Sequence, residues 1–261
     1  MPERSSYPHG VPSWADVSSP DIVASAAFYA ALFGWDHVTP EDPEATGGYG
    51  MFALRGKFVA GLGPLQEPGA PAAWTTYIAV DDADEAVIRA GEHGGQVAMD
   101  PLDVFDAGRM AFLVDPAGAF VGVWQAGRHA GAELVSEPGA IGWNELACRD
   151  AATVKPFYAG VFGWHASPSA IGGGDHYETF DDEGGPVAGL LTMTERWPAE
   201  IPPHWMTYVI VDDAAATAER AGRLGGTVAV APVEVAAAGT IAILVDPFGA
   251  TFSIMQPVAA G

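Results

Sequence analysis

Apolar positions along this chain change period from one segment to the next, and these changes predict its elements. From residue 20 to residue 33 they recur every three or four residues, which is typical of an amphipathic helix. Ser19 and Pro20 have the character of a helix cap and a first helical residue, and Gly34 can adopt the left-handed conformation that ends a helix. Residues 75–80 instead alternate and are rich in β-branched and aromatic side chains, which indicates a strand.

A second helix is predicted directly after the 75–80 strand. Asp82 and Glu85 have the spacing of a capping box, and Gly94-Gly95 marks the end of the helix. A short alternating segment at residues 14–18 precedes the first helix, and short apolar segments follow both helices. We expect strands at residues 50–55, 58–62, 96–99, 109–114 and 120–124. The order is therefore a strand, a helix and short strands, twice over.

This whole pattern occurs a second time about 130 residues later in the chain. The recurring landmarks include Trp14 and Trp143, Phe33-Gly34-Trp35 and Phe162-Gly163-Trp164, Tyr49 and Tyr177, Ala60-Gly61-Leu62 and Ala188-Gly189-Leu190, and the closing Leu-Val-Asp-Pro turns. A repeat of this period indicates a duplicated domain. The second copy differs at Pro156, which lies beyond the first helical turn and is expected to delay or kink that helix.

The fold class predicted from this duplication is α+β, with four βαβββ modules in two domains. We expect one domain over residues 1–128 and the other over residues 139–261. Residues 129–138 between them are rich in glycine, alanine and charge and lack periodicity, so they are predicted to be a linker. Four modules can form two cavities within one chain, whether they pair within a copy or between copies, and we therefore expect a monomer.

Charge and cysteine content narrow the classes of partner. The formal net charge of −22 opposes binding to nucleic acid or to anionic membranes. No stretch is long and apolar enough to span a bilayer, and the first 14 residues lack a basic segment followed by an apolar run. The single cysteine, Cys148, cannot form an internal disulfide. We expect a cytoplasmic protein whose partner is a small molecule.

Four modules with these motifs resemble the vicinal oxygen chelate superfamily. The motifs are an aspartate followed by Phe-Tyr within the first helix, the Phe-Gly-Trp segment after it, Val-Asp-Asp before the second helix, and the Leu-Val-Asp-Pro-x-Gly turn. That superfamily includes glyoxalase I, bleomycin-resistance and fosfomycin-resistance proteins and extradiol dioxygenases. Residues 10–16 and 140–145 are similar to a signature of tandem actinobacterial members described as glyoxalase-like or hydroxylase-like. The resemblance implies sheets that curl around half-open, barrel-like cavities.

The resemblance also implies where a metal would be held in the enzymes of the superfamily. Its ligand positions, usually His, Gln or Glu, match Trp14, Thr75 and Gly122 in the first copy and Trp143, Met206 and Ser253 in the second. None of these six is a residue type that binds a divalent metal well. The usual triad is therefore absent from the sequence, and we predict neither a metal site nor another cofactor.

Strand alternation places one carboxylic acid beside each of two tryptophans. If Trp14 and Trp143 face their cavities, then Asp16 and Glu145 face them too. An inward carboxylate suits a general base or an anchor for a ligand amine, although it could equally hydrogen-bond within the fold. Tyr77 and Tyr208 lie on the same face and are candidate proton donors.

The remaining predicted lining is aromatic or apolar, with few polar groups. A flat, largely apolar ligand suits such a surface, although the same rings could also fill a core. Arg109, near a strand start, could neutralise an inward carboxylate or a ligand carboxylate. Besides Trp14, Trp143 and Arg109, the candidate ligand-binding residues are Thr75, Met206, Phe120, Trp124, Ser253 and Met255.

These residues and motifs support three hypotheses. The first is a binding protein that sequesters an aromatic or apolar metabolite or antibiotic. The second is a metal-independent enzyme of secondary metabolism or aldehyde detoxification, with Asp16 or Glu145 as base and Tyr77 or Tyr208 as proton donor. The third, and least favoured, is a metal-dependent glyoxalase or extradiol dioxygenase with other ligands.

Overall fold

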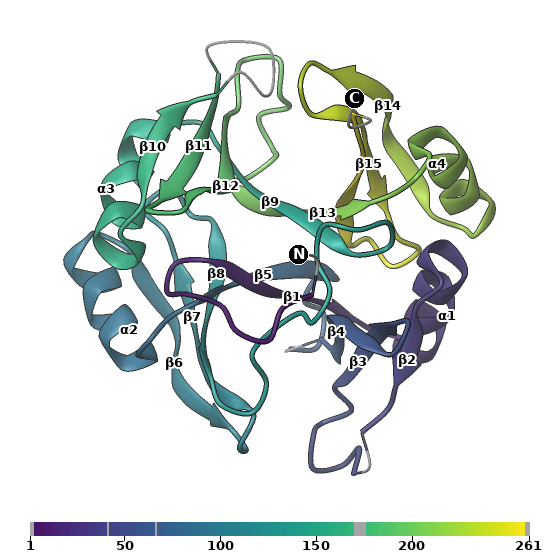
Figure 1. Ribbon diagram of the computed structural model, residues 1–261, viewed down its shortest axis with the longest axis horizontal. Coiled ribbons are helices and arrows are strands. Elements are labelled where there is room, and N and C mark those ends of the chain that lie inside the picture. Colours follow the sequence, from purple (N-terminus) through teal and green to yellow (C-terminus); the bar gives the residue numbers. More distant parts are fainter. Residues whose placement is uncertain (1–2, 41, 66, 170–175, 259–261) are drawn as a thin grey trace.

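Each copy of the repeat forms one eight-stranded, strongly curved sheet with two helices. The computed structural model describes residues 3–40, 42–65, 67–169 and 176–258. Figure 1 shows the two sheets with their central strands adjacent and their concave sides facing away from each other, so that the molecule has two cups that open on opposite sides. The predicted α+β fold of four modules in two open, barrel-like domains is confirmed.

The elements of the first copy follow the predicted module order. They are β1 (Pro12–Ser19), α1 (Ile22–Phe33), β2 (Asp36–Val38), β3 (Gly50–Leu54), β4 (Lys57–Pro64), β5 (Ala73–Ala79), α2 (Ala83–Glu92), β6 (Gln96–Val104), β7 (Gly108–Val114) and β8 (Phe120–Ala126). The short strand β2 was not predicted from the sequence, because three residues are too few to show a period.

The second copy repeats these elements in the same order. They are β9 (Ile141–Cys148), α3 (Ala151–Phe162), β10 (His165–Pro168), β11 (Tyr177–Asp182), β12 (Gly185–Thr192), β13 (His204–Ile210), α4 (Ala214–Arg223), β14 (Thr227–Val235), β15 (Gly239–Val245) and β16 (Thr251–Pro257).

Modules pair within a copy, which the sequence left open. The first sheet has the order β2-β3-β4-β1-β5-β8-β7-β6, and the second has the equivalent order β10-β11-β12-β9-β13-β16-β15-β14. The two modules of each copy meet where their first strands run antiparallel, with Trp14 opposite Tyr77 and Trp143 opposite Tyr208. These central strands form the floor of each cup.

Helix α1 begins two residues later than predicted. Its cap is Asp21, whose side chain accepts a hydrogen bond from the amide of Ala24 at 2.9 Å, and Pro20 lies before the helix. Ser19 was predicted to be the cap, but its hydroxyl lies 2.6 Å from that of Ser25 in the buried interior. An aspartate with extended backbone replaces the serine as cap, and Gly34 ends the helix with φ of 75°, as predicted.

The other helix predictions need two corrections. Asp82 caps α2 through the amides of Asp84 and Glu85, but the Glu85 side chain pairs with Arg89 instead of closing a capping box. Pro156 does not delay α3, which begins directly after Asp150 and contains the proline, and the alternative of a kink stays a prediction. The flanking residues Phe157 and Tyr158 are fully buried, and this packing holds the helix around the proline.

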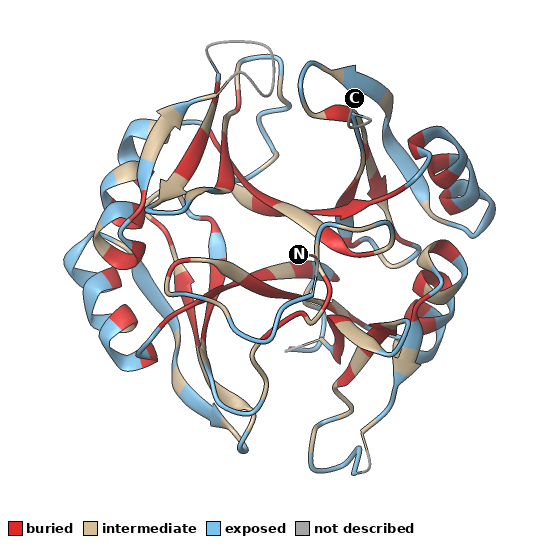
Figure 2. Cartoon of the chain, in the orientation of Figure 1, coloured by how far each residue is buried: buried red, intermediate tan, exposed pale blue. Residues whose placement is uncertain are grey.

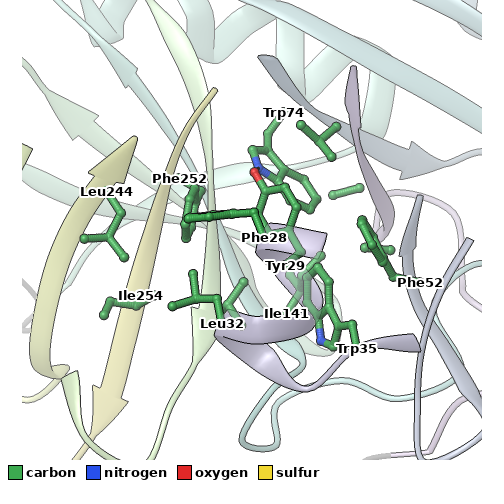
Figure 3. Packing of buried hydrophobic residues seen from close by; sticks show 14 of the residues in the cluster. Phe28, Tyr29, Leu32, Trp35, Phe52, Trp74, Ile141, Leu244, Phe252 and Ile254 are labelled. Atoms are coloured by element: carbon green, nitrogen blue, oxygen red, sulfur yellow. The ribbon is translucent and has the colours of Figure 1, made fainter. Parts of the chain in front are cut away.

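The main hydrophobic cores lie between the copies. One joins α1 and the neighbouring strands of the first copy to α4, β15 and β16 of the second. Figure 3 shows this core around Tyr29, with Trp74 on one side of its ring and Phe252 on the other. A second core joins α2, β7 and β8 to α3 and the strands around it. In Figure 2 the buried positions of all four helices face inward and their outer faces are exposed. Each copy therefore completes the core of the other.

Two matching polar contacts fasten the copies together inside these cores. The hydroxyl of Tyr29 donates to Asp246 at 3.0 Å and accepts from the Trp74 indole at 2.9 Å. In the other core, Tyr158 donates to Asp115 and accepts from Trp205 at the same distances. The repeated Phe-Tyr and Asp-Pro motifs of the sequence are thus partners across the interface between the copies. No helix in the described part of the chain is long and apolar enough to cross a membrane.

Candidate functional site

The concave side of the second sheet holds a cavity of about 330 Å³. The strands that line it, β9 and β11 to β16, form the upper cup in Figure 1. Its lining is almost entirely aromatic and aliphatic, with one carboxyl group. The lining residues are Trp143, Glu145, Tyr177, Leu191, Tyr208, Val235, Ala237, Ala238, Ile241 and Met255.

Glu145 lies on the floor of this second cup, within hydrogen-bonding reach of two tyrosines. Glu145 is 6% exposed, and its Oε1 accepts a hydrogen bond of 2.9 Å from the hydroxyl of Tyr208. The hydroxyl of Tyr177 acts on the same carboxyl as a second donor and accepts from the Trp143 indole at 3.0 Å. The four side chains therefore form one connected network around a single acid.

The strand β12 must carry a glycine for this network to form. A Cβ atom on Gly189 would overlap the Tyr177 hydroxyl and lie 3.0 Å from Cγ of Glu145. Gly61 has the same role in the first sheet, where a Cβ atom would overlap the hydroxyl of Tyr49 and lie 2.7 Å from its Cζ. The repeated Ala-Gly-Leu motif thus makes room for a tyrosine hydroxyl above each acid.

Burial is the largest cause of the raised pKa values in this network. Desolvation raises the pKa of Glu145 to about 7, against smaller lowering effects of the hydrogen bonds from Tyr208 and Tyr177. Burial, followed by the nearby charge of Glu145, raises the pKa of Tyr208 well above its usual range. Near neutral pH the acid therefore exists in both protonation states, while the tyrosines keep their protons.

The first cup contains the equivalent network around Asp16. The carboxylate Oδ2 accepts from Tyr77 at 2.9 Å and from Tyr49 at 3.1 Å, and Tyr49 accepts from the Trp14 indole at 2.9 Å. Desolvation raises the pKa of Asp16 to about 6 despite these hydrogen bonds. The same chemistry has thus been placed in both copies.

The two cups differ in the size of the side chains on their walls. Where the first cup has Trp124 and Met110, facing each other in the strand register, the second has Met255 and Ile241. Phe112 of the first cup corresponds to Ile243 of the second, and Met51 corresponds to Thr179. Trp14, Tyr77, Phe112 and Trp124 pack together as a small apolar cluster. The walls of the second cup therefore carry smaller side chains than those of the first.

The structure brings eight of the predicted site residues together in the two cups. Trp143, Glu145, Tyr208 and Met255 line the second cavity, and Trp14, Asp16, Tyr77 and Trp124 gather in the first cup. Met206 and Ser253 are buried strand partners of Glu145 and Tyr208, and the described cavity lining contains neither. Thr75 is the strand partner of Asp16.

Two predicted site residues lie apart from the networks. Phe120 is 42% exposed and contacts Phe112 with a centroid distance of 4.8 Å. Arg109 pairs with Asp84 and Asp103, both at 2.8 Å, at the outer surface. The carboxyl of Asp16 therefore has tyrosine donors and not this guanidinium as its partners.

Tyr49 and Tyr177 were not predicted as site residues. Both belonged to the recurring landmarks, each at or just beside the edge of a strand in a segment that carried no other chemical signal. Their role depends on the register that sets β3 beside β4 and β4 beside β1, which brings each tyrosine over the glycine opposite the acid. Recurrence of a tyrosine in both copies was the signal that could have found them.

The donor set does not fit a metal ion of the kind that the superfamily's enzymes use. Among residues 3–40, 42–65, 67–169 and 176–258 there is no group of three His, Cys, Asp or Glu side chains that could hold one. Asp16 and Glu145 each stand as a single acid among tyrosines and apolar side chains.

Fold and sequence together define the class of protein. Residues 12–123 match the family model of the glyoxalase/bleomycin resistance protein/dioxygenase superfamily, and residues 143–255 match that of a glyoxalase-like domain. This chain belongs to that superfamily. A Mycobacterium tuberculosis protein named as a candidate glyoxylase, CFP32, is 42% identical over 98% of both chains. The anthracycline biosynthesis protein DnrV of Streptomyces peucetius is 39% identical over 97% of both chains.

Solved structures agree with the fold. The Mn(II)-bound glyoxalase from Novosphingobium aromaticivorans matches with a TM-score of 0.65 and 19% identity, covering 95% of this chain and 83% of that one. The 2,3-dioxygenase LapB from Pseudomonas sp. KL28 matches with a TM-score of 0.64 and 14% identity, over 95% and 93% of the two chains. At these identities the likeness concerns the fold alone.

Proposed function

We propose that the second cup binds a small, ring-bearing and largely apolar molecule, and that Glu145 holds the polar group of that molecule. The observation that carries this proposal is the cavity of about 330 Å³, lined by rings and aliphatic side chains around one buried acid. Cavities that bind small molecules typically combine an apolar lining with a few convergent polar groups. The size is at the lower end of such sites, which favours a compact ligand.

The charge of the site favours a ligand with a basic amine or a hydroxyl group. An ionised Glu145 pairs with an ammonium group, and a protonated Glu145 donates to a ligand oxygen; the pKa of about 7 allows both. The overall charge of −22 also attracts cations over long range. Two relatives are named for anthracycline biosynthesis, and anthracyclines are fused-ring compounds, which supports a planar ring system as the ligand class.

Calorimetry with three ring-matched probes tests this proposal. At pH 8 we expect 1-(aminomethyl)naphthalene to bind more tightly than 2-naphthol, and 1-naphthoate to bind least. Glu145→Gln removes the charge partner and is expected to weaken binding of the amine about tenfold, which corresponds to about 1.4 kcal/mol. Trp143→Leu should weaken all three probes.

Asp16→Asn is the matched control, since it changes the equivalent acid in the other cup and should leave binding of the probes unchanged. The proposal fails if no probe binds, or if the amine loses affinity in Asp16→Asn and keeps it in Glu145→Gln. Sequestration of a metabolite or antibiotic is the simplest use of such a site, because it needs no chemical step.

A metal-independent enzyme is the second candidate, and the protonation of Glu145 favours it. An acid with pKa near 7 can accept a proton from a bound substrate at neutral pH and return it, and Tyr208, whose hydroxyl donates to the carboxyl at 2.9 Å, holds that carboxyl in position. The ligand would then return altered from the protein, which mass spectrometry detects. In that case Glu145→Gln abolishes turnover while binding of a neutral ligand persists, and Tyr208→Phe lowers turnover. No step of either candidate uses a metal.

A further inference from the structure

The linker between the copies crosses the first cup and contacts its tryptophans. After β8 the backbone amides of Gly127 and His129 donate to the carbonyl of Ala107, in the β6–β7 turn. Further along, the amide of Ala132 donates to Ser13, and Glu133 bonds to Phe58 through both its backbone and its side chain. The segment 127–133 is thus fastened to both rims of the cup and to the edge of its floor.

This segment places an aromatic ring against the tryptophans of the first cup. The imidazole of His129 meets Trp14 edge to face, with centroids 4.5 Å apart and planes at 84°, and it meets Trp124 at 5.8 Å. The indole of Trp124 donates to the carbonyl of His129 at 2.8 Å. The Nε2 atom of His129 is buried and has no hydrogen-bond partner among the described residues, and burial lowers the pKa of the imidazole. Burial therefore favours the neutral form of this ring.

The second cup has no such occupant in the described part of the chain. Trp143, the counterpart of Trp14, is partly exposed and lines the open cavity. At the position of Trp124, whose indole binds the carbonyl of His129, the second cup has Met255. At the positions of Asp106 and Ala107, whose carbonyls accept from the linker backbone, the second cup has Ala237 and Ala238. The two cups therefore share an acid network and differ in what lies over the tryptophan.

We propose that the first cup is a ring-binding site whose ligand is the chain's own linker, with the His129 imidazole as the internal ligand. The tryptophan of the first cup is then covered by this ring, whereas Trp143 of the second cup is open to a free molecule. The class of ligand that the first cup accepts is a small, neutral, planar ring placed edge-on to Trp14 and within contact of Trp124. This inference concerns the first cup alone and does not require the proposed function of the second.

Ring rescue of a His129→Ala variant tests the inference. The substitution leaves the linker backbone in place and removes the ring, so it opens a cavity between two tryptophans. Imidazole at pH 8, where it is mostly neutral, should refill that cavity and raise the Tm of the variant by about 3 °C when its concentration is ten times its Kd. The wild-type Tm should not rise, since its own ring fills the site. His129→Phe keeps a ring and should not respond to imidazole.

His165→Ala is the matched control, because His165 is an exposed histidine of the second copy with no ring contact among the described residues. Its Tm should respond to imidazole no more than that of the wild type. Equal responses of His129→Ala and wild type would overturn the inference, as would a His129→Ala Tm equal to that of the wild type without imidazole. Binding of two naphthalene probes per wild-type chain, one of them lost in Asp16→Asn, would overturn it as well.

Discussion

At the scale of single residues, the molecule is defined by two buried acids with unusual protonation. Glu145 and Asp16 are held by tyrosine hydroxyls, and within the described ranges neither has a cation as partner. A carboxyl paired with an arginine loses its proton easily, whereas a carboxyl surrounded by rings keeps it to a higher pH. Each buried acid therefore destabilises the folded protein at neutral pH. Buried acids with such shifted pKa values are typical of binding and catalytic sites.

The raised pKa of Glu145 predicts a specific pH dependence of stability. The pKa rises from 4.5 in the unfolded chain to about 7 in the folded one, so the folded protein retains a proton that the unfolded chain releases between these pH values. The proton on Glu145 therefore adds to the free energy of unfolding fully below pH 4.5. This stabilisation, on the order of 3 kcal/mol, is lost as the pH rises through 7. Glu145→Gln has no such proton to lose.

Denaturant unfolding of wild type and Glu145→Gln across the pH range measures this effect. The variant should gain stability relative to wild type as the pH rises from 4.5 to 8. Asp16→Asn should gain stability relative to wild type over a lower pH range, between pH 3.8 and about pH 6. A difference between wild type and Glu145→Gln that stays constant with pH would contradict the assignment of a buried, protonated acid.

At the scale of elements, the sequence located the helices well and their first residues less well. Periodicity and the glycine after Phe33 placed α1 and its end correctly. The start was misplaced because Ser19, Pro20 and Asp21 all have the character of helix-start residues, and only the buried contact between Ser19 and Ser25 decides among them. Pro156 remained helical for a similar reason, since packing of Phe157 and Tyr158 against the other copy outweighs the local preference.

The cap of α1 supplies a prediction at this scale. Asp21→Ala leaves the amide of Ala24 without its partner and should lower the free energy of unfolding by about 1 kcal/mol. Asp21→Asn keeps an acceptor oxygen and should cost only a fraction of that. Denaturant unfolding of both variants measures the two values, and equal losses would show that the charge of Asp21, and not its hydrogen bond, stabilises the helix.

At the scale of the whole molecule, the duplication is visible in the sequence but its consequence is not. The order of modules and the presence of an acid beside a tryptophan in each copy follow from motifs that recur. The sharing of each core between copies does not, because it depends on which helix of one copy meets which helix of the other. The difference between the cups was also hidden, since it depends on strand register and on the path of residues 127–133.

Shared cores predict that one copy does not fold alone as a monomer. A fragment of residues 1–138 would expose Tyr29, Phe28 and Leu32, which pack against the second copy or lie in the same core. It should be largely unfolded or self-associated, whereas the full chain should sediment as a monomer. Analytical ultracentrifugation and circular dichroism measure both. A fragment that is monomeric and cooperatively folded would contradict the shared-core arrangement.

A crystal structure of the wild-type protein soaked with 1-(aminomethyl)naphthalene tests most directly whether the two cups have separate roles. We expect one molecule per chain, seated in the second cup with its ring against Trp143 and its amine on Glu145, while His129 remains in place over Trp14. Electron density for the probe in the first cup, or none in the second, would contradict this division between the cups.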